Sequence, residues 1–373
     1  MEDLLFLSHR IPYPPDKGDK IRSWNIFRHL AERYRIHLAC FVDDENDRTH
    51  VPALQERCAG SFFADLSPRL ARVKSLSRLA TGEALTVGYF HHREITRWIA
   101  DLVARISPRH AFVYSSGVAQ LLMKPTYASM RRVIDFVDVD SDKWRQYADQ
   151  QPWPIRAIYR REARTLLQFE RRVASAFAAS LFVSPREAAL FRSLAPECAD
   201  KVLSVNNGVD YEYFSPDWPC DNPYADNRPT ICFTGAMDYW PNRDAVIWFA
   251  REVLPLLRTR GVAVQFVIVG SNPAADVRQL AQDDDVIVTG RVPDVRPYLA
   301  HADVVVAPLR LARGVQNKVL EAMAMARSLV VTPQALEGID ADPGTHLQVA
   351  DSADAFARSV AALLRAPAAA GMG

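Results

Sequence analysis

The sequence predicts an α/β protein with two parallel β-sheets in tandem. Short apolar runs alternate with longer stretches of helical periodicity, first over about residues 4–205 and again over 231–332. This alternation is typical of βα units, in which parallel strands are buried beneath helices on both faces of the sheet. Between the two series, residues 215–229 are rich in Pro, Asp and Asn, which disfavour both helices and central strands. We therefore expect one sheet on each side of this segment.

The first series begins with a strand at 4–7 and a helix at about 19–32. Further strands are predicted at 36–42, 111–114, 133–137, 181–183 and 202–205. In the loop after the first strand, Gly18 permits a turn towards a cleft between the domains. Lys17 and Lys20 can then face an anionic ligand, and Lys17, Gly18 and Asp19 are the candidate site residues of this loop. The alternative is an ordinary solvated loop that carries helix-start charges.

The second series contains strands at 231–235, 263–270, 286–290, 303–307 and 329–332. Three of these strands end in a glycine: Gly235, Gly270 and Gly290. Glycine at a strand end removes the Cβ that would block a diphosphate or a base, although a tight βα turn has the same requirement.

The domain organisation follows from these two series. We expect a first domain at 1–214, a linker at 215–229 and a second domain at 230–352. A terminal helix is predicted at 353–366, which can pack on either domain, and the Ala- and Gly-rich tail at 367–373 is expected to fray.

The segment from Gly314 to Ala324 is the most informative in the chain. It lies between the strands at 303–307 and 329–332, so its helix begins at the carboxyl ends of parallel strands, where α/β proteins bind nucleotides. The first N–H groups of the helix suit a diphosphate, and Glu321 can accept hydrogen bonds from ribose hydroxyls. The alternative is a crossover helix on which Lys318 and Glu321 form a solvated i,i+3 pair.

Composition excludes several classes of protein. The 373 residues are 49% hydrophobic and 24% charged, as in a globular protein, and the net charge of +1 argues against a dedicated nucleic-acid binder. The five cysteines lack metal-ligand spacing and suit free thiols in a reducing cytoplasm. The chain shows no basic-then-apolar leader and no apolar run near the roughly 20 residues that span a bilayer.

The acidic run at 138–142 suggests a metal site, but its pattern does not support one. An EF-hand loop that starts at Asp138 requires Gly at its sixth position and Glu at its twelfth, where this chain has Lys143 and Asp149. We therefore expect no metal. Asp138 and Asp140 are candidate catalytic residues that hydrogen-bond an acceptor hydroxyl or a donor sugar. The alternative is that Asp140 or Ser141 caps the following helix.

Residues 156–172 form a predicted basic amphipathic helix. Its arginines are Arg156, Arg160, Arg161, Arg164, Arg171 and Arg172. Such a helix can lie on an anionic bilayer, and a second basic stretch at 69–78 lies in the same domain. The alternative is a solvated face that Glu162 and Glu170 partly balance. The first interpretation predicts a cytoplasmic protein that is peripheral on the inner face of the cell membrane.

Several motifs together resemble a known family. The string SVNNGVD at 204–210, followed by Phe214 and Pro216, resembles the signature that ends the first domain of GT-B glycosyltransferases of family 4. Val183-Ser184 with Glu187 resembles the family's "VS…E" element, 289–295 its nucleobase-side loop and 317–324 its sugar-nucleotide helix. The amino-terminal loop, 239–242 and 312–318 resemble the bacterial sugar transferases associated with PEP-CTERM exopolysaccharide systems.

The resemblance implies a fold, an activity and a set of site residues. It implies a GT-B fold, in which two Rossmann-like domains with parallel sheets face a cleft. The implied activity moves a sugar from a nucleotide-sugar donor to a glycan or polyprenyl-linked glycan, with retention of configuration and without a cofactor. Together with the residue patterns above, it gives Asp138, Asp140 and Lys318 as the candidate catalytic residues. The candidate donor-binding residues are Gly235, Arg243, Arg291, Val292, Arg313, Gly314, Val315, Asn317, Lys318 and Glu321.

The chain departs from the family pattern at two positions. Glu321 matches the second Glu of the family's E-x7-E motif, which binds ribose, but the first Glu is replaced by Arg313. Ala236 replaces the basic residue that follows the first glycine of the second domain. Donor identity and neutralisation of the diphosphate therefore stay open, and Arg313, Arg243 and Lys318 are candidates for the missing positive charge.

Two other functions remain compatible with the sequence. A nucleotide-sugar epimerase uses the same architecture but needs acid and base groups instead of a second sugar substrate. A non-catalytic binder of sugar nucleotides or glycans also fits, because of the substitutions at 236 and 313. The nucleotide, the sugar, the linkage and the oligomeric state are not predicted.

Overall fold

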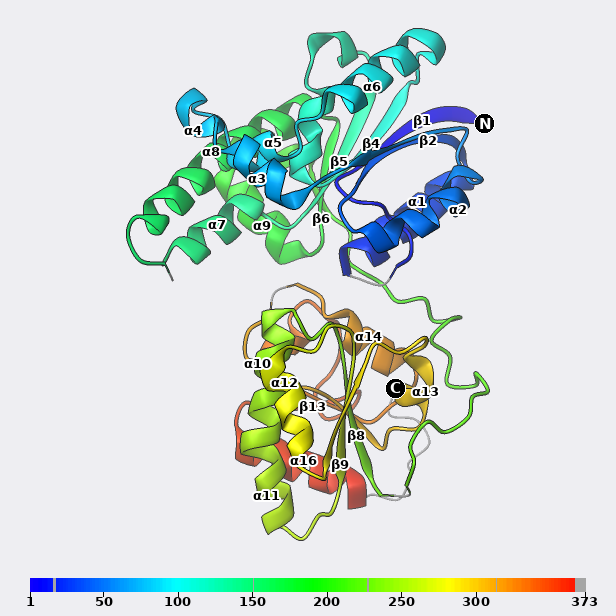
Figure 1. The fold of residues 1–373 in the computed structure, drawn as a ribbon, viewed down its shortest axis with the longest axis vertical. Helices are drawn as coiled ribbons and strands as arrows, with labels where there is room; N and C mark the ends of the chain where they lie inside the picture. The colour runs from blue at the N-terminus through cyan, green and yellow to red at the C-terminus, as the bar shows by residue number, and fades with distance from the viewer. Residues whose placement is uncertain (16–17, 150, 227, 313, 366–373) are drawn as a thin grey trace. The chain divides into compact units, whose positions relative to one another are not determined.

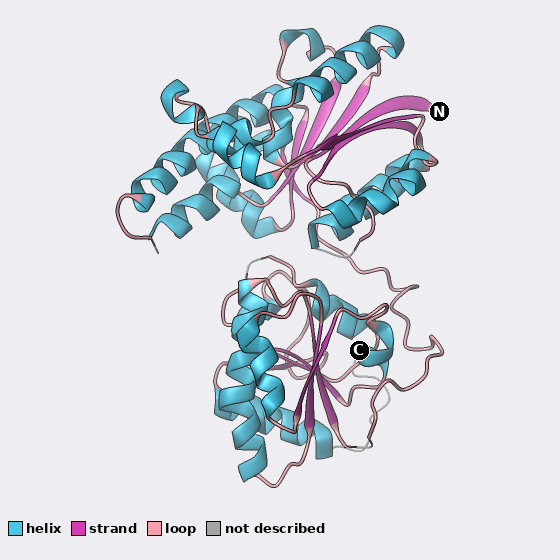
Figure 2. Ribbon diagram, in the orientation of Figure 1, coloured by secondary structure: helices cyan, strands magenta, loops and turns pink. Residues whose placement is uncertain are grey.

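The computed structural model describes residues 1–15, 18–149, 151–226, 228–312 and 314–365. Its internal contacts divide the chain into two compact units, Met1–Asn206 and Asn207–Gly373. Each unit is an α/β structure with one sheet, as Figures 1 and 2 show.

The sheet of the first unit has seven parallel strands in the order β3-β2-β1-β4-β5-β6-β7. The strands are β1 Glu2–Ser8, β2 Tyr34–Val42, β3 Gly60–Asp65, β4 His110–Tyr114, β5 Arg131–Val137, β6 Ala179–Phe182 and β7 Val202–Ser204. Along β1, Leu5 and Leu7 join the apolar core on one face of the sheet, whereas Leu4 and Phe6 join the core on the other. Burial on both faces explains why this strand reads as a continuous apolar run.

Helices cover both faces of the first sheet (Figure 2). The α-helices are α1 Gly18–Ala31, α2 Val51–Gln55, α3 Pro68–Ser75, α4 Arg78–Thr81, α5 Leu85–Tyr89, α6 Arg93–Ile106, α7 Asp140–Asp149, α8 Ile155–Ala176 and α9 Pro185–Leu194. Short 3₁₀ segments are η1 Glu45–His50, η2 Ser116–Leu122, η3 Pro125–Tyr127 and η4 Pro196–Lys201.

The second unit has a six-stranded parallel sheet in the order β10-β9-β8-β11-β12-β13. Its strands are β8 Thr230–Thr234, β9 Gln265–Val269, β10 Val286–Gly290, β11 Val304–Ala307, β12 Leu329–Val331 and β13 Gln348–Val349. Its helices are α10 Trp240–Trp248, the π-helical η5 Phe249–Val253, α11 Leu254–Thr259, α12 Ala275–Gln279, the 3₁₀ segment η6 Leu280–Gln282, α13 Arg296–Ala300, α14 Asn317–Ala324, α15 Pro333–Leu336 and α16 Ala353–Arg365.

The second unit begins earlier than the sequence predicts. Residues 207–214, predicted to end the first domain, pack on the second unit. Phe214 contacts its apolar core, and the guanidinium of Arg296 lies 3.7 Å from the ring centroids of both Tyr213 and Trp218. These cation–π and apolar contacts hold the predicted end of the first domain and the start of the predicted linker on the second unit.

The terminal helix α16 also packs on the second unit, although the sequence left open a crossing to the first. Phe356 is fully buried and makes edge contacts with the rings of Trp248 and Phe249. Val360 belongs to the same core. The apolar face of α16 is thus covered by the second sheet and its helices.

Candidate functional site

Glycines end three neighbouring strands of the second sheet, and each has a different role. A Cβ on Gly270 would lie 1.6 Å from the carbonyl oxygen of Gly235, so Gly270 is required for backbone packing. A Cβ on Gly235 would lie 2.8 Å from Nζ of Lys318 and 2.6 Å from Nδ2 of Asn242. Gly290 has φ +71° and open space around it. Only Gly235 therefore leaves room for a functional side chain.

The ammonium of Lys318 lies at the carboxyl end of β8. Its Nζ donates to Oδ1 of Asn242 at 2.6 Å and lies 4.0 Å from the ring centroid of Phe233. Nδ2 of Asn242 in turn donates to the Ala236 carbonyl at 2.9 Å. Helix α14 thus brings a positive charge to the 235–236 loop, where the family pattern places a basic residue that this chain lacks.

Helix α14 begins with N–H groups that no described side chain caps. Its N-cap residue, Gln316, has extended backbone and makes no side-chain cap, and Gly314, with φ +65°, precedes it in the left-handed region. Uncapped N–H groups at a helix start bind anions readily. Val315 is buried, and Asn317 accepts a hydrogen bond from Asn207 at 3.4 Å. The predicted site residue Arg313 lies outside the described residues.

Glu321 lies one turn after Lys318, and both side chains are half-buried. The carboxylate of Glu321 makes no hydrogen bond or salt bridge with a residue that the structure describes, although its backbone carbonyl accepts from Met325 N. Burial raises the pKa of Glu321 to about 7, with Lys318 opposing the shift. Burial likewise lowers the pKa of Lys318 to about 7, with Glu321 opposing it. The solvated surface pair is thus wrong, and both groups titrate near neutral pH.

The structure does not bring Arg243 to Lys318. Its Nε donates to Asp276 Oδ2 at 2.6 Å, and the side chain lines a surface groove of about 340 Å³ together with Trp248 and Arg310. The preceding residue on α10, Asn242, is the one that contacts Lys318. Adjacent helical residues point in different directions, so α10 can present only one of the two to this site.

The nucleobase-side loop follows β10. Arg291 is exposed, whereas Val292 is half-buried and packs against the core of the second unit. Val292 therefore anchors the loop and leaves Arg291 at the surface.

In the first unit, Asp138 and Asp140 meet at Lys143. The Lys143 ammonium lies 2.8 Å from Asp138 Oδ2 and 3.2 Å from Asp140 Oδ1. Ser116 also donates to Asp140, at 3.1 Å. Burial alone would lower the pKa of Lys143, but the two carboxylates outweigh burial and raise it. Lys143 is therefore a permanent cation, and two carboxylates face it.

Buried acids hold the loop that carries these aspartates. Glu187 accepts from the Val139 N–H at 2.8 Å, and its own N–H is capped by Ser184 at 3.2 Å. Glu170, fully buried, accepts from the Ser141 hydroxyl at 2.5 Å, so Ser141 does not cap α7. Burial and the nearby Asp140 raise the pKa of Glu170 to about 8, against the hydrogen bonds from Ser141. The "VS…E" element thus positions the loop between β5 and α7.

Strained backbone lies beside this loop. Ser115 follows β4 and has a φ of +83°, and Val137 is the last residue of β5 and has a φ of +69°. Positive φ values are unfavourable for non-glycine residues, and most of all for a β-branched residue such as valine. Asp135 holds both: its carbonyl accepts from Ser115 N at 2.8 Å and its Oδ1 from Val137 N at 3.0 Å. Strain of this kind is retained mainly at functional sites.

The loop after β1 is held within its own unit. Lys17 lies outside the described residues, and Gly18 begins α1. Asp19 accepts from Arg10 Nη1 at 2.9 Å and lies 3.5 Å from His9 Nε2. Burial would raise the pKa of Asp19, but His9 and Arg10 lower it below its usual range. Asp19 is therefore an ionised partner of Arg10 and lies beside the ring of His9.

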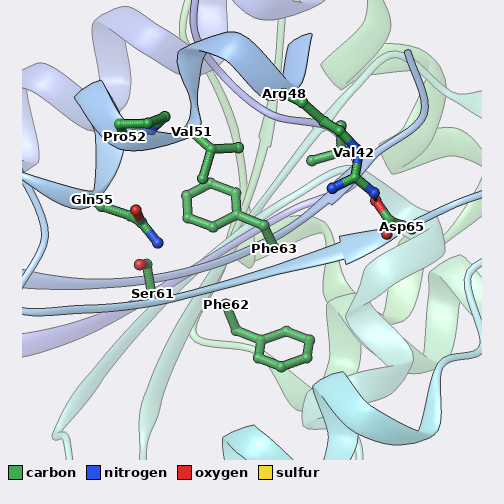
Figure 3. A pocket seen from close by; sticks show the side chains of 9 residues that line it. All are labelled: Val42, Arg48, Val51, Pro52, Gln55, Ser61, Phe62, Phe63 and Asp65. Carbon is green, nitrogen blue, oxygen red and sulfur yellow. Dashed lines mark ion pairs between the residues drawn. The ribbon is translucent and has the colours of Figure 1, made fainter. Parts of the chain in front are cut away.

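A separate cavity of about 400 Å³ lies beside the edge strand β3 (Figure 3). Its lining includes Val51, Phe63 and an ion pair between Arg48 and Asp65. Figure 3 shows Phe63 directed towards Val51 and Phe62 directed to the opposite face of the strand. None of the predicted site residues lines this cavity, so it is not part of the candidate site.

Within the described ranges, no three His, Cys, Asp or Glu side chains are grouped to hold a metal ion. No helix in the same ranges is both long and apolar enough to cross a bilayer.

Comparison with known proteins agrees with this architecture. Residues 228–366 match the family model of the glycosyl transferases group 1. HepE of Anabaena in complex with UDP is similar at 12% identity, covering 97% of this chain and 90% of HepE, with a TM-score of 0.65. Sucrose-phosphate synthase of Thermosynechococcus elongatus is similar at 16% identity over 98% and 91% of the two chains, with a TM-score of 0.67.

A third similar structure is the α,α-trehalose-phosphate synthase (UDP-forming) of Burkholderia xenovorans, at 12% identity over 98% and 92% of the chains and a TM-score of 0.60. No curated protein sequence matches the chain. The fold is therefore GT-B, and with the matched domain it defines a glycosyltransferase. More specifically, residues 228–366 of the second unit are similar to the group 1 glycosyl transferases, the family that the sequence motifs resemble.

Sequence reasoning missed four residues of these arrangements: Phe233, Asn242, Lys143 and Glu170. The sequence signal for Phe233 and Asn242 is the replacement of a basic residue by Ala236. Loss of that residue implies that another cation takes its place and that neighbouring side chains contact this cation. Lys143 is signalled by its spacing, since a lysine three residues after Asp140 on a helix can reach it. Glu170 has no such local signal.

Proposed function

We propose that this glycosyltransferase moves a sugar from a nucleotide-sugar donor to a hydroxyl of a glycan or polyprenyl-linked glycan in exopolysaccharide biosynthesis. It acts with retention of configuration and without a metal, in the cytoplasm and peripherally on the inner face of the cell membrane. One observation carries the proposal: the Lys318 ammonium lies beside Gly235 at the carboxyl end of β8, with the unpaired Glu321 one turn further along the same helix.

In this proposal the donor diphosphate binds against the 235–236 loop and the start of α14. Lys318 and the helix N–H groups neutralise it, while Glu321 accepts hydrogen bonds from the ribose. HepE has been crystallised with UDP and with UDP-glucose, which favours a uridine nucleotide here. Arg291, exposed on the loop after β10, contributes on the nucleobase side.

The reaction breaks the bond between the sugar C1 and the diphosphate oxygen, and the electron pair leaves with the nucleoside diphosphate. The acceptor oxygen forms the new bond to C1, and its proton passes to the departing diphosphate. A fixed cation at Lys318 stabilises the charge that develops on this leaving group. Asp138 and Asp140, held by Lys143, orient the acceptor hydroxyl.

Product analysis tests the proposed reaction. We expect one of UDP-, GDP-, ADP- or CMP-linked sugars, incubated with the protein and a polyprenyl-diphosphate-linked glycan, to yield free nucleotide and a lengthened glycan, measured by chromatography and mass spectrometry. An isomerised donor without free nucleotide would instead identify an epimerase. Binding of a nucleotide sugar without any product would identify a non-catalytic binder.

Donor affinity is expected to be highest near pH 7 and to fall on both sides. Above pH 7 Lys318 loses its proton in the free protein, and affinity falls by up to about tenfold per pH unit because the bound diphosphate requires the ammonium. Below pH 7 Glu321 becomes protonated and can no longer accept from both ribose hydroxyls. Isothermal titration calorimetry with UDP-glucose from about pH 6 to 8 measures both limbs.

Two variants separate these limbs. Lys318→Arg carries a guanidinium that does not titrate in this range, so the alkaline limb should flatten while the acid limb stays. Glu321→Gln should flatten only the acid limb. An unchanged profile in both variants would assign the pH dependence to other groups.

A further inference from the structure

One surface of the first unit combines exposed apolar side chains with cations. On α3 and just after it, Leu70, Val73 and Leu76 are 61%, 67% and 52% exposed. Exposed Arg69 and Arg72 lie between them. Residues 66–82 contain four cationic residues and no acidic one. Large apolar side chains gathered in this way on a protein surface usually mark an interaction site.

The inner side of the same segment is firmly packed. Ala71 and Ser75 are buried on the face of α3 opposite to the exposed leucines, and α3 lies against α5. Gly88 of α5 is so close that a Cβ there would lie 3.2 Å from Cα of Ser75. The exposed apolar residues are therefore displayed by a structured element and not by a frayed end.

Two consecutive residues of α8, Arg161 and Glu162, bind backbone groups at the starts of α4 and α5. Arg161 Nη2 donates to the Arg78 carbonyl at the start of α4, at 2.8 Å. Glu162 accepts from the N–H groups of Leu85 and Thr86 at the start of α5, at 2.6 and 2.9 Å. A carboxylate at a helix start is also favoured by the helix dipole. The first turns of α8 thus lie next to α4.

The first turns of α8 extend the same chemistry. Trp153, just before the helix, is 83% exposed, and Ile155 and Ile158 are also exposed. Arg156 is exposed between the two isoleucines, and Arg160, which pairs with Asp149 at 3.4 Å, is exposed just after them. The acids that the sequence analysis weighed as a balance, Glu162 and Glu170, are fully buried. They bind backbone N–H groups of α5 and α7, so they do not neutralise this face.

We propose that residues 69–79 and 153–160 form a docking surface for the anionic face of a lipid bilayer. The apolar side chains enter the headgroup boundary while the neighbouring cations pair with lipid phosphates, and Trp153 takes the interfacial position that tryptophan favours. A protein partner fits less well, because the centres of protein interfaces are depleted of charge, whereas here every apolar residue adjoins a cation. The inference rests on the peripheral membrane location in the proposed function and assigns it to a surface, and its test does not depend on the transfer reaction.

Vesicle sedimentation tests the proposal without any donor or acceptor. The full-length protein should bind vesicles of phosphatidylcholine with phosphatidylglycerol and should not bind phosphatidylcholine alone. Arg69→Ala/Arg72→Ala should weaken binding on the order of 30-fold, from about 1 kcal/mol per cation near anionic lipid. Leu70→Ser/Val73→Ser should also weaken vesicle binding. The binding that remains should depend more strongly on salt concentration, because salt screens the electrostatic contribution and does not screen the apolar contribution that this variant loses.

A matched control separates this surface from overall charge. Arg105→Ala/Arg109→Ala removes two exposed arginines from the same unit, outside the proposed surface, and should leave vesicle binding unchanged. Equal weakening by both arginine pairs, or no binding of the wild type to anionic vesicles, would overturn the proposal. Since all four arginines are exposed, thermal melting should be unchanged and folding does not confound the result.

Discussion

Replacement of Lys318 by methionine is expected to lower turnover of the nucleotide sugar by about 10²–10³-fold, because one fixed group that stabilises leaving-group charge contributes about that much. Methionine fills a similar volume over Phe233 but carries no charge, and Asn242 loses its donor. Nucleotide release in a coupled assay, with kcat and KM determined separately, measures the effect. A lower kcat with an unchanged KM would show that the Lys318 charge stabilises the transition state more than the bound substrate.

The matched control is Arg251→Met, which removes an exposed cation from the same unit. It should leave kcat and KM at wild-type values. Full activity of Lys318→Met would refute the assignment of the diphosphate cation, even if the protein is a glycosyltransferase by product analysis.

Replacement of Asp135 by alanine is expected to lower the free energy of unfolding by about 3–5 kcal/mol, as is typical when one partner of a buried ion pair is removed. Asp135 is fully buried, and its Oδ2 lies 2.8 Å from Nε of Arg22, itself 6% exposed. The variant also removes the acceptor that holds the strained backbone at Val137. Urea denaturation, followed through the transition of the first unit, measures the change in midpoint.

Asp149→Ala is the corresponding surface control. Asp149 and Arg160 form an exposed pair at 3.4 Å, and such pairs contribute at most about 1 kcal/mol. A similar loss of stability in both variants would show that burial of the Arg22–Asp135 pair carries no special weight.

Hydrophobic periodicity in the sequence predicts most of the fold. Two strands that it did not predict, β3 and β13, show its limits. The predicted strands are confirmed, and central ones such as β8 and β11 are buried along their whole length. The edge strand β3 was missed, since four of its six residues are only half-buried and its sequence has no long apolar run. Strand β13 has two residues and exists only by pairing with β12, which no local pattern encodes.

The geometry of the candidate site could be predicted only in part, for a similar reason. The position of α14 between two buried strands was enough to single out Lys318 and Glu321. The sequence could not show that Arg243 pairs with Asp276, because the two lie 33 residues apart on different helices. Nor could it show that Glu162 and Glu170 point inward, since their partners are backbone N–H groups of other elements.

Lys318 and Glu321 lie on the same helix, α14, and this fixes the distance between them. Three residues of α-helix advance about 4.5 Å along the axis, so their separation is set by backbone geometry and not by loop conformation. In the proposed function, this pair contacts only the phosphate and the ribose, which all nucleoside diphosphates have in common. Selectivity between donors must then have evolved in residues outside α14, and exchange of one donor for another can leave this helix unchanged.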